Sequence, residues 1–358
     1  MNEPKQTPGW GRALIWTGLG LSLFLILYTL SGVLLPFVVA FIVAYLIDPV
    51  VDRLERWRIP RAGGAAIVTI SFFALLTLAV VLLAPVLNAQ LAGLAERLAV
   101  IARQGFELAK PYLEDFFDKA SAVEMQQLSG AGDAVRTATA WLLRAAGSVI
   151  SGGLAVVNVL SLVFITPVVV FYLVRDWRKV QEKIDSWLPR QYAQTIRGLL
   201  QEIDARMAGF LRGQALVCLF LAVFYAVGLT LTGLNYGLLV GLMTGMLSFI
   251  PYVGMFVGMA TGLAIAFFQF PSWIDFGLVV AVFLLGQFLE GNFVSPKLVG
   301  DRVGLHPLWM LFAIFAGGGL FGFTGVLLAI PIAAAVGVLA RFALQRYLAS
   351  SLYRGPGA

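Results

Sequence analysis

The chain has 358 residues, of which 60% are hydrophobic and only 12% are charged, and its mean hydropathy is +0.89. A water-soluble fold could not bury so much apolar surface, so a soluble globular protein is excluded and lipid is the expected main solvent. Lys and Arg exceed Asp and Glu by 25 to 19, and we expect this excess on the cytoplasmic side, where lipid headgroups are anionic.

Five stretches without a charged residue are long enough to cross a bilayer. About 20 helical residues span a hydrocarbon core of roughly 30 Å, and a chain in lipid must satisfy its own backbone hydrogen bonds, so each crossing is predicted to be a helix. By this measure the stretch 213–274 holds three crossings, and the stretches 13–47 and 303–340 hold two each. The stretches are residues 13–47, 62–95, 145–174, 213–274 and 303–340.

Residues 1–85 are predicted to form N-terminal transmembrane helices. Residues 13–30 follow Lys5 and Arg12 as in a signal peptide, but no small-x-small cleavage pattern comes after them. We therefore interpret this segment as an anchor that is retained. A helical hairpin from about 13 to 51 would leave basic residues on the cytoplasmic side at both of its ends.

Residues 86–148 are predicted to be a periplasmic amphipathic helical arm. Their acidic and basic residues nearly balance, and apolar residues recur at alternating spacings of four and three, which places them along one side of a helix. This seam fits a helix that folds back on its own domain, and it also fits an intersubunit coiled-coil contact. The seam residues are Leu87, Leu91, Leu94, Leu98 and Ile101.

The rest of the chain continues the same alternation. Residues 149–174 are predicted to cross inward, and residues 175–212, with eight Lys and Arg, to form cytoplasmic amphipathic helices on the membrane surface. Residues 213–345 form the C-terminal transmembrane region, and residues 346–358 a cytoplasmic tail. The expected fold is all-α: a polytopic transmembrane helical protein with re-entrant or broken helical hairpins, in a bacterial inner membrane with both termini cytoplasmic.

Residues able to carry out chemistry are sparse. Cys218 is the only cysteine and His306 the only histidine, so we expect no disulfide framework, no metal site and no other cofactor. The sequence has no GxxxxGK[ST] pattern and no GxGxxG after a strand, and the glycines between 317 and 325 fit a hairpin turn with close helix contacts. With no catalytic constellation, the protein is not expected to be an enzyme.

Polar residues that interrupt apolar segments are the candidates for a substrate or ion pathway. Glu290, Gly291 and Asn292 are followed by Pro296, so the helix can break beside an acidic group, which is how transporters build sites in mid-membrane. An equally weighted interpretation places Glu290 at headgroup level, where it would pair with Lys297.

Two other places carry candidate residues. Pro251, Tyr252 and Gly254 lie in the middle of the longest apolar stretch, where the proline predicts either a re-entrant hairpin or a plain bend between helices. Asp48 precedes Pro49 at the start of the first basic loop, and for this acid a position at the membrane interface is the favoured interpretation.

Short motifs spread in order over almost the whole chain carry a family resemblance. They are Leu-Pro-Phe at 35–37, Ala-Tyr-Leu-Ile-Asp-Pro at 44–49, Pro-Val-Val-Val-Phe-Tyr at 167–172 with Asp176, Arg-Gly-Gln at 212–214, Ser-Phe-Ile-Pro-Tyr-Val-Gly at 248–254, Glu-Gly-Asn at 290–292 with Pro296, Lys297 and Gly300, Leu-His-Pro at 305–307, and Ala-Ile-Pro at 329–331. Together they resemble the autoinducer-2 exporter family, also called PerM-type permeases. Met255 departs from the family, in which proline often follows the Tyr-Val-Gly step.

The resemblance implies a multi-pass, oligomeric permease, with substrates that include a quorum-sensing furanone precursor in some members and sodium or lithium against protons in others. We expect an ATP-independent secondary transporter that exports a small polar molecule such as an autoinducer-2-like signal. The alternatives are a sodium(lithium)/proton antiporter, in which Glu290, alone or together with Asp48 or Asp275, carries the proton, and a non-transporting oligomeric scaffold. The expected partners are the lipid bilayer, further copies of the chain and a small polar solute or cation, but no nucleic acid.

Overall fold

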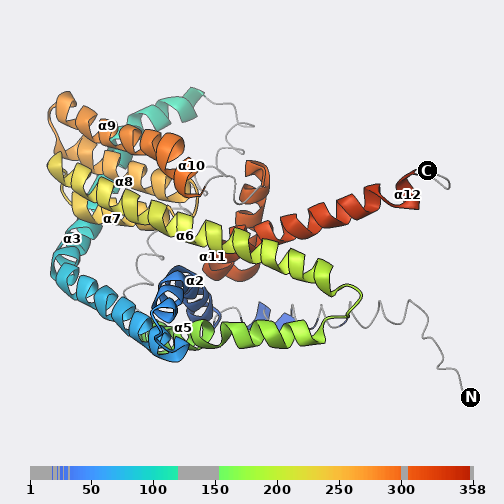
Figure 1. Ribbon diagram of the computed structural model, residues 1–358. Coiled ribbons are helices and arrows are strands. Elements are labelled where there is room, and N and C mark those ends of the chain that lie inside the picture. The colour runs from blue at the N-terminus through green and yellow to red at the C-terminus, as the bar shows by residue number, and fades with distance from the viewer. Residues whose placement is uncertain are drawn as a thin grey trace, which may run out of the picture. The chain divides into compact units, whose positions relative to one another are not determined.

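The computed structural model describes residues 33–119, 153–299 and 305–354, together with scattered positions between 18 and 30. All regular structure in these residues is helical, which confirms the predicted all-α class (Figure 1). Residues 120–152, which hold much of the predicted arm, lie outside the described residues. Five helical segments in the described part are long and apolar enough to cross a membrane: Leu35–Arg56, Arg61–Leu91, Ala193–Leu231, Trp273–Leu298 and Pro307–Leu348.

The chain divides into two compact units. Unit 1 holds Met1–Ala66, Ile165–Arg212 and Val299–Ala358, and unit 2 holds Ile67–Phe164 and Gly213–Leu298. Three long helices contribute residues to both units: α3 (Arg61–Lys119), α5 (Gly153–Trp187) and α6 (Ala193–Leu231).

Unit 1 begins with α2 (Leu35–Arg56). A proline in its first turn suits a position where the backbone N–H would lack an intrahelical partner. The helix buries small and β-branched residues at spacings of three and four, so one side of it packs inward. These residues are Ala40, Val43, Ala44, Ile47 and Val51. The turn that follows α2 contains Arg58 with a positive φ of 68° and leads directly into α3.

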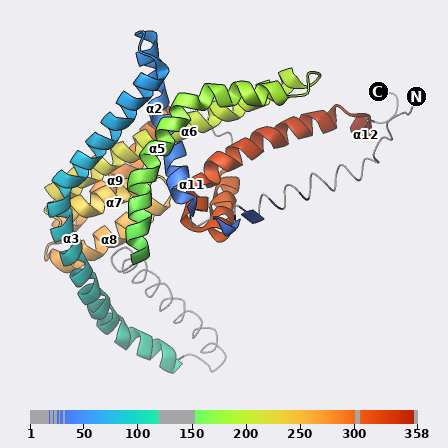
Figure 2. The same cartoon turned by 90° about the horizontal axis from the view of Figure 1, so that it is seen from below.

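The last helical region of unit 1 is a hairpin within α11 (Pro307–Leu348), followed by the short α12 (Ser351–Arg354). Gly322 has φ 59° and ψ −141°, a conformation that glycine adopts without a Cβ clash, and the chain reverses there. The arms then approach closely, because a Cβ placed on Gly317 would lie 2.6 Å from the carbonyl oxygen of Gly325. Figure 2 shows this reversal of α11, which confirms a broken helical hairpin in the glycine-rich segment.

Unit 2 contains a series of packed neighbours, α7 (Gly237–Leu247), α8 (Val253–Gln269) and α9 (Trp273–Leu289), which lie side by side (Figure 1). Because α7 has 11 residues and α8 has 17, each is shorter than the roughly 20 residues of a full crossing. After α9 come the π-helix η2 (Glu290–Val294) and α10 (Ser295–Leu298).

Glycine contacts hold α7 against its neighbours in unit 2. There is no room for a Cβ on Gly241 or Gly245, because the backbones of Ala226 and Ala222 in α6 lie directly against them. Gly258 of α8 also has no room for a Cβ, here because the side chain of Thr244 lies against it. Such close backbone approach is typical of helices that pack in lipid.

The start of the predicted arm packs on its own unit. Gln90 of α3 accepts a hydrogen bond at 3.0 Å from the backbone N–H of Leu239 in the first turn of α7. Arg97 donates at 3.3 Å to the carbonyl of Phe268 near the end of α8. Leu94 is buried, whereas Leu91 is 46% exposed. These contacts favour the intrachain interpretation for the first part of the seam, while the side chains of Leu98 and Ile101 lie outside the described residues.

Candidate functional site

The segment around Glu290 is continuous with α9. Ser272 caps the start of this helix by accepting a hydrogen bond at 3.2 Å from the backbone N–H of Ile274. At the other end, the N–H of Ser295 donates to the carbonyl of Glu290, five residues back. Pro296 has no N–H with which to close an ordinary α-helical bond. The predicted break is therefore a widened π-helical turn, a feature frequent at functional sites.

The polar residues of this turn differ in their surroundings. Glu290 is half-buried, and no ion pair or hydrogen bond of its side chain occurs within the described residues, Lys297 included. The side-chain amide of Asn292 is exposed and donates at 2.9 Å to the carbonyl of Phe288. Gly291 has open space where a Cβ would be, and Pro296 is exposed. Glu290 is therefore the member of this group whose carboxyl group has no partner among the described residues.

A buried tyrosine of α6 lies beside this turn. Tyr225 is 1% exposed, and its ring centroid lies 5.4 Å from that of Phe283 in α9. Its hydroxyl oxygen would lie 2.5 Å from a Cβ on Gly286, one helical turn before Glu290. The Glu290 carboxylate interacts electrostatically with both Tyr225 and the thiol of Cys218. Two helices thus bring an acid, a phenol and a thiol together in apolar surroundings.

The same side of α6 reaches the turn between α7 and α8. Gln214 is 7% exposed, and its amide nitrogen donates at 2.6 Å to the carbonyl of Ser248, which caps the end of α7. Tyr252 has a positive φ of 69°, a strained conformation for a residue with a Cβ, and its side chain is exposed. Gly254 has no room for a Cβ, because Ser248 and Thr244 lie against it. Pro251 lies within this turn, between α7 and α8.

Gln214 and Tyr225 are site residues that the sequence reasoning missed. Spacings of four, three, four and three place Gln214, Cys218, Leu221, Tyr225 and Gly228 on one side of α6. This spacing could have identified them from the sequence, because it aligns three polar or polarisable side chains on one side of a helical stretch without charges. Their side of α6 links the two groups of candidates, around Glu290 and around Pro251.

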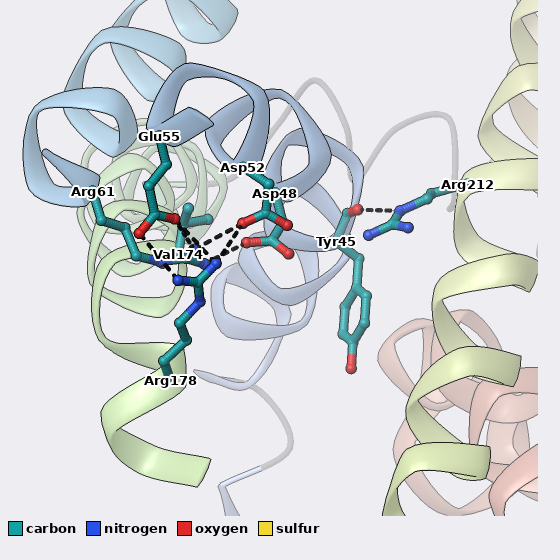
Figure 3. A network of polar contacts seen from close by, with 8 residues as sticks. All are labelled: Tyr45, Asp48, Asp52, Glu55, Arg61, Val174, Arg178 and Arg212. Atoms are coloured by element: carbon teal, nitrogen blue, oxygen red, sulfur yellow. Dashed lines mark hydrogen bonds and ion pairs between the residues drawn. The ribbon is translucent and has the colours of Figure 1, made fainter. Parts of the chain in front are cut away.

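Asp48, the remaining candidate from the sequence, belongs to a separate cluster in unit 1 (Figure 3). Arg61 donates at 2.8 Å to Asp48, at 2.8 Å to Asp52 and at 3.2 Å to Glu55, all from one side of α2. It also donates at 2.9 Å to the carbonyl of Val174 in α5. The charge of Asp48 is therefore matched by a neighbouring cation, unlike that of Glu290.

Further contacts extend this cluster to α5 and α6. Arg178 pairs with Asp52 at 3.2 Å and with Glu55 at 3.0 Å. The Tyr45 hydroxyl donates at 2.6 Å to Asp204. Arg212 donates at 2.8 Å to the carbonyl of Tyr45 (Figure 3). A cavity of about 30 Å³ adjoins Tyr45 and Asp48. Because its charges pair with one another across several helices, this cluster is suited to holding unit 1 together.

Comparison with known proteins extends over nearly the full chain. A family model described as "AI-2E family transporter" matches residues 18–345. "Putative permease PerM" of Escherichia coli is 31% identical over 323 residues, which cover 87% of each chain. "Putative transport protein YueF" of Bacillus subtilis is 28% identical over 86% of this chain and 83% of its own length. "Putative transport protein YrrI" of the same organism is 28% identical over 92% of this chain and 95% of its own.

Proposed function

The chain belongs to the AI-2E transporter family, and from this membership we propose that it is an ATP-independent secondary transporter that exports a small polar molecule across a bacterial inner membrane. The coarser statement, a multi-pass membrane transporter, follows from the family and from the five helical segments able to cross a membrane. An autoinducer-2-like signal is the solute that the family's name suggests.

The observation that carries the proposal is the half-buried Glu290 on a π-helical turn within an otherwise apolar segment. A carboxylate without a partner in such surroundings costs several kcal/mol of desolvation, so ionisable residues inside membrane segments are rare and mark ion or substrate pathways. The polar side of α6 extends the site from Glu290 towards the turn between α7 and α8. An acid in this position can take up a proton or a cation and can orient a polar solute.

The energy source is inferred from the sequence. The chain contains no phosphate-binding loop for ATP, whereas a carboxylate whose charge changes during the cycle couples transport to an ion gradient. The same residue supports the second candidate function, exchange of sodium or lithium for protons, because one unpaired carboxylate can bind either kind of ion in turn. Solute export and cation exchange therefore depend on the same side chain.

The test is transport by purified protein in vesicles under an imposed pH gradient. We expect Glu290→Gln to lower the rate at least tenfold and Glu290→Asp to keep part of it, because glutamine preserves size and hydrogen bonding but loses the charge. Efflux of a furanone signal and proton movement on addition of sodium or lithium distinguish the two candidate functions. Glu182→Gln, at an exposed position of α5, is the matched control.

Three outcomes would leave the proposal without support. A wild-type rate in Glu290→Gln would remove the residue from the mechanism. Loss of activity in the Glu182→Gln control as well would show that the assay reports general damage. Wild-type protein that moves neither solute nor ion in any gradient would instead support the third possibility, a non-transporting oligomeric scaffold.

A further inference from the structure

The hydroxyl group of Tyr225 is buried without a hydrogen-bond partner in the described part of the chain. A phenylalanine would fill the same space without this oxygen. An unsatisfied buried hydroxyl costs about 1–3 kcal/mol, and such groups are few in native proteins. The oxygen is therefore available to accept or donate a hydrogen bond when a neighbouring group moves.

Glu290 is the ionisable group of the described residues that interacts electrostatically with Tyr225. The Tyr225 oxygen lies against Gly286, where any larger side chain would block it, and Glu290 follows one turn later on the same helical stretch. Cys218 of α6 also interacts electrostatically with the carboxylate. Neither α7 nor α8 contains a titratable residue, and Lys297 forms no ion pair with Glu290 within the described residues. Among the described residues, Tyr225 and Cys218 are thus the titratable groups of α6 that interact with Glu290.

We propose that Tyr225 is the positioning residue for Glu290: the ionised carboxylate turns inward and accepts a hydrogen bond from the Tyr225 hydroxyl, and uptake of a proton releases it to the half-exposed position of this structure. The inference rests on the proposed function, in which the charge of Glu290 changes during transport. A phenol keeps its proton at neutral pH, and an ionised carboxylate can only accept hydrogen bonds, so the donor and acceptor are fixed. The π-helical turn has loosened hydrogen bonding that can accommodate the movement.

The first experiment measures the carboxyl group directly and does not require transport. Infrared spectra of purified protein in lipid nanodiscs are recorded across a pH series, and the band that disappears in Glu290→Gln is assigned to the protonated Glu290 carboxyl. In Tyr225→Phe the charged form loses its hydrogen bond, so the midpoint of this titration should move to higher pH by about one unit, the shift expected for one such bond. Tyr236→Phe, which removes a phenol oxygen elsewhere in unit 2, should leave the midpoint unchanged.

The second experiment follows the pH dependence of transport in vesicles. The pH at which Tyr225→Phe runs at half its maximal rate should rise by the same amount, with a smaller change in the maximal rate. Equal titration midpoints in wild type, Tyr225→Phe and Tyr236→Phe would overturn the inference, even if Glu290→Gln abolishes transport. A shifted infrared midpoint in a protein that transports nothing would support the hydrogen bond and reject the proposed function.

Discussion

Replacing Arg61 by glutamine tests whether the charged cluster of unit 1 stabilises that unit. The substitution removes the guanidinium that holds Asp48, Asp52, Glu55 and the carbonyl of Val174. Arg61 is 13% exposed and Asp48 is 28% exposed, so the pair is neither fully buried nor free in solvent. Breaking a fully buried pair costs about 3–5 kcal/mol, and breaking an exposed one costs about 0–1 kcal/mol.

The pairing of the other charges narrows the expected loss of stability. Arg178 continues to pair with Asp52 and Glu55 after the change, so the loss falls mainly on Asp48, which keeps no pairing cation at short range. We expect Arg61→Gln to lower the free energy of unfolding by about 2–3 kcal/mol, between the two limits. Adding Asp48→Asn should recover about 1 kcal/mol, because the remaining unpaired charge is then removed.

The assay is thermal unfolding of purified protein in detergent, followed by the helical circular dichroism signal and by tryptophan fluorescence, since Trp177 lines the cavity beside the cluster. The control is Arg53→Gln, at an exposed position on α2 with no partner among the described residues. The reasoning is refuted if Arg61→Gln is as stable as Arg53→Gln, or if Asp48→Asn lowers the stability of Arg61→Gln further.

Two remaining predictions concern topology and assembly. In a cysteine-free background, a cysteine at Ser121 should react with a membrane-impermeant reagent in intact cells and one at Ser186 should not; the opposite pattern would invert the proposed orientation. Leu91→Ser, at the exposed part of the seam, should lower the oligomer mass in detergent if the arm joins subunits. An unchanged mass with normal folding would leave the seam only its contacts within unit 2, where Leu94 is already buried.

Much of the fold was predictable because apolar length and helix-breaking residues are properties of the local sequence. Charge-free stretches indicated the helices, and Gly322 and Pro251 lie in or beside the chain reversals. Which side chains contact one another was harder to predict from the sequence. Arg61 is one of the basic residues after the first predicted hairpin, and the charge pattern predicts only their side of the membrane. In the structure it pairs with acids of α2 and with a carbonyl 113 residues further along the chain. Periodicity shows which side of a helix is apolar but not which helix will pack against it.

The candidate site shows the same limit. Glu290 was identifiable because a lone acid stands out in apolar sequence. Tyr225 and Gln214 were not, because a tyrosine or glutamine in a long apolar stretch is compatible with many positions. Their roles depend on where α6 lies beside α9 and beside the end of α7, which is decided by tertiary packing. The π-helical form of the predicted break was likewise beyond the sequence pattern, since Pro296 is equally compatible with a kink.

The glycine contacts between α6 and α7 have a mechanical consequence. Where the backbone at Gly241 and Gly245 meets that at Ala226 and Ala222, no flexible side chain lies between the helices to absorb a displacement. Sliding one helix along the other would bring a Cβ into a backbone, so this pair must move as a rigid body. Any motion within unit 2 is then confined to segments with looser bonding, and the π-helical turn at Glu290 is where a hinge would cost least.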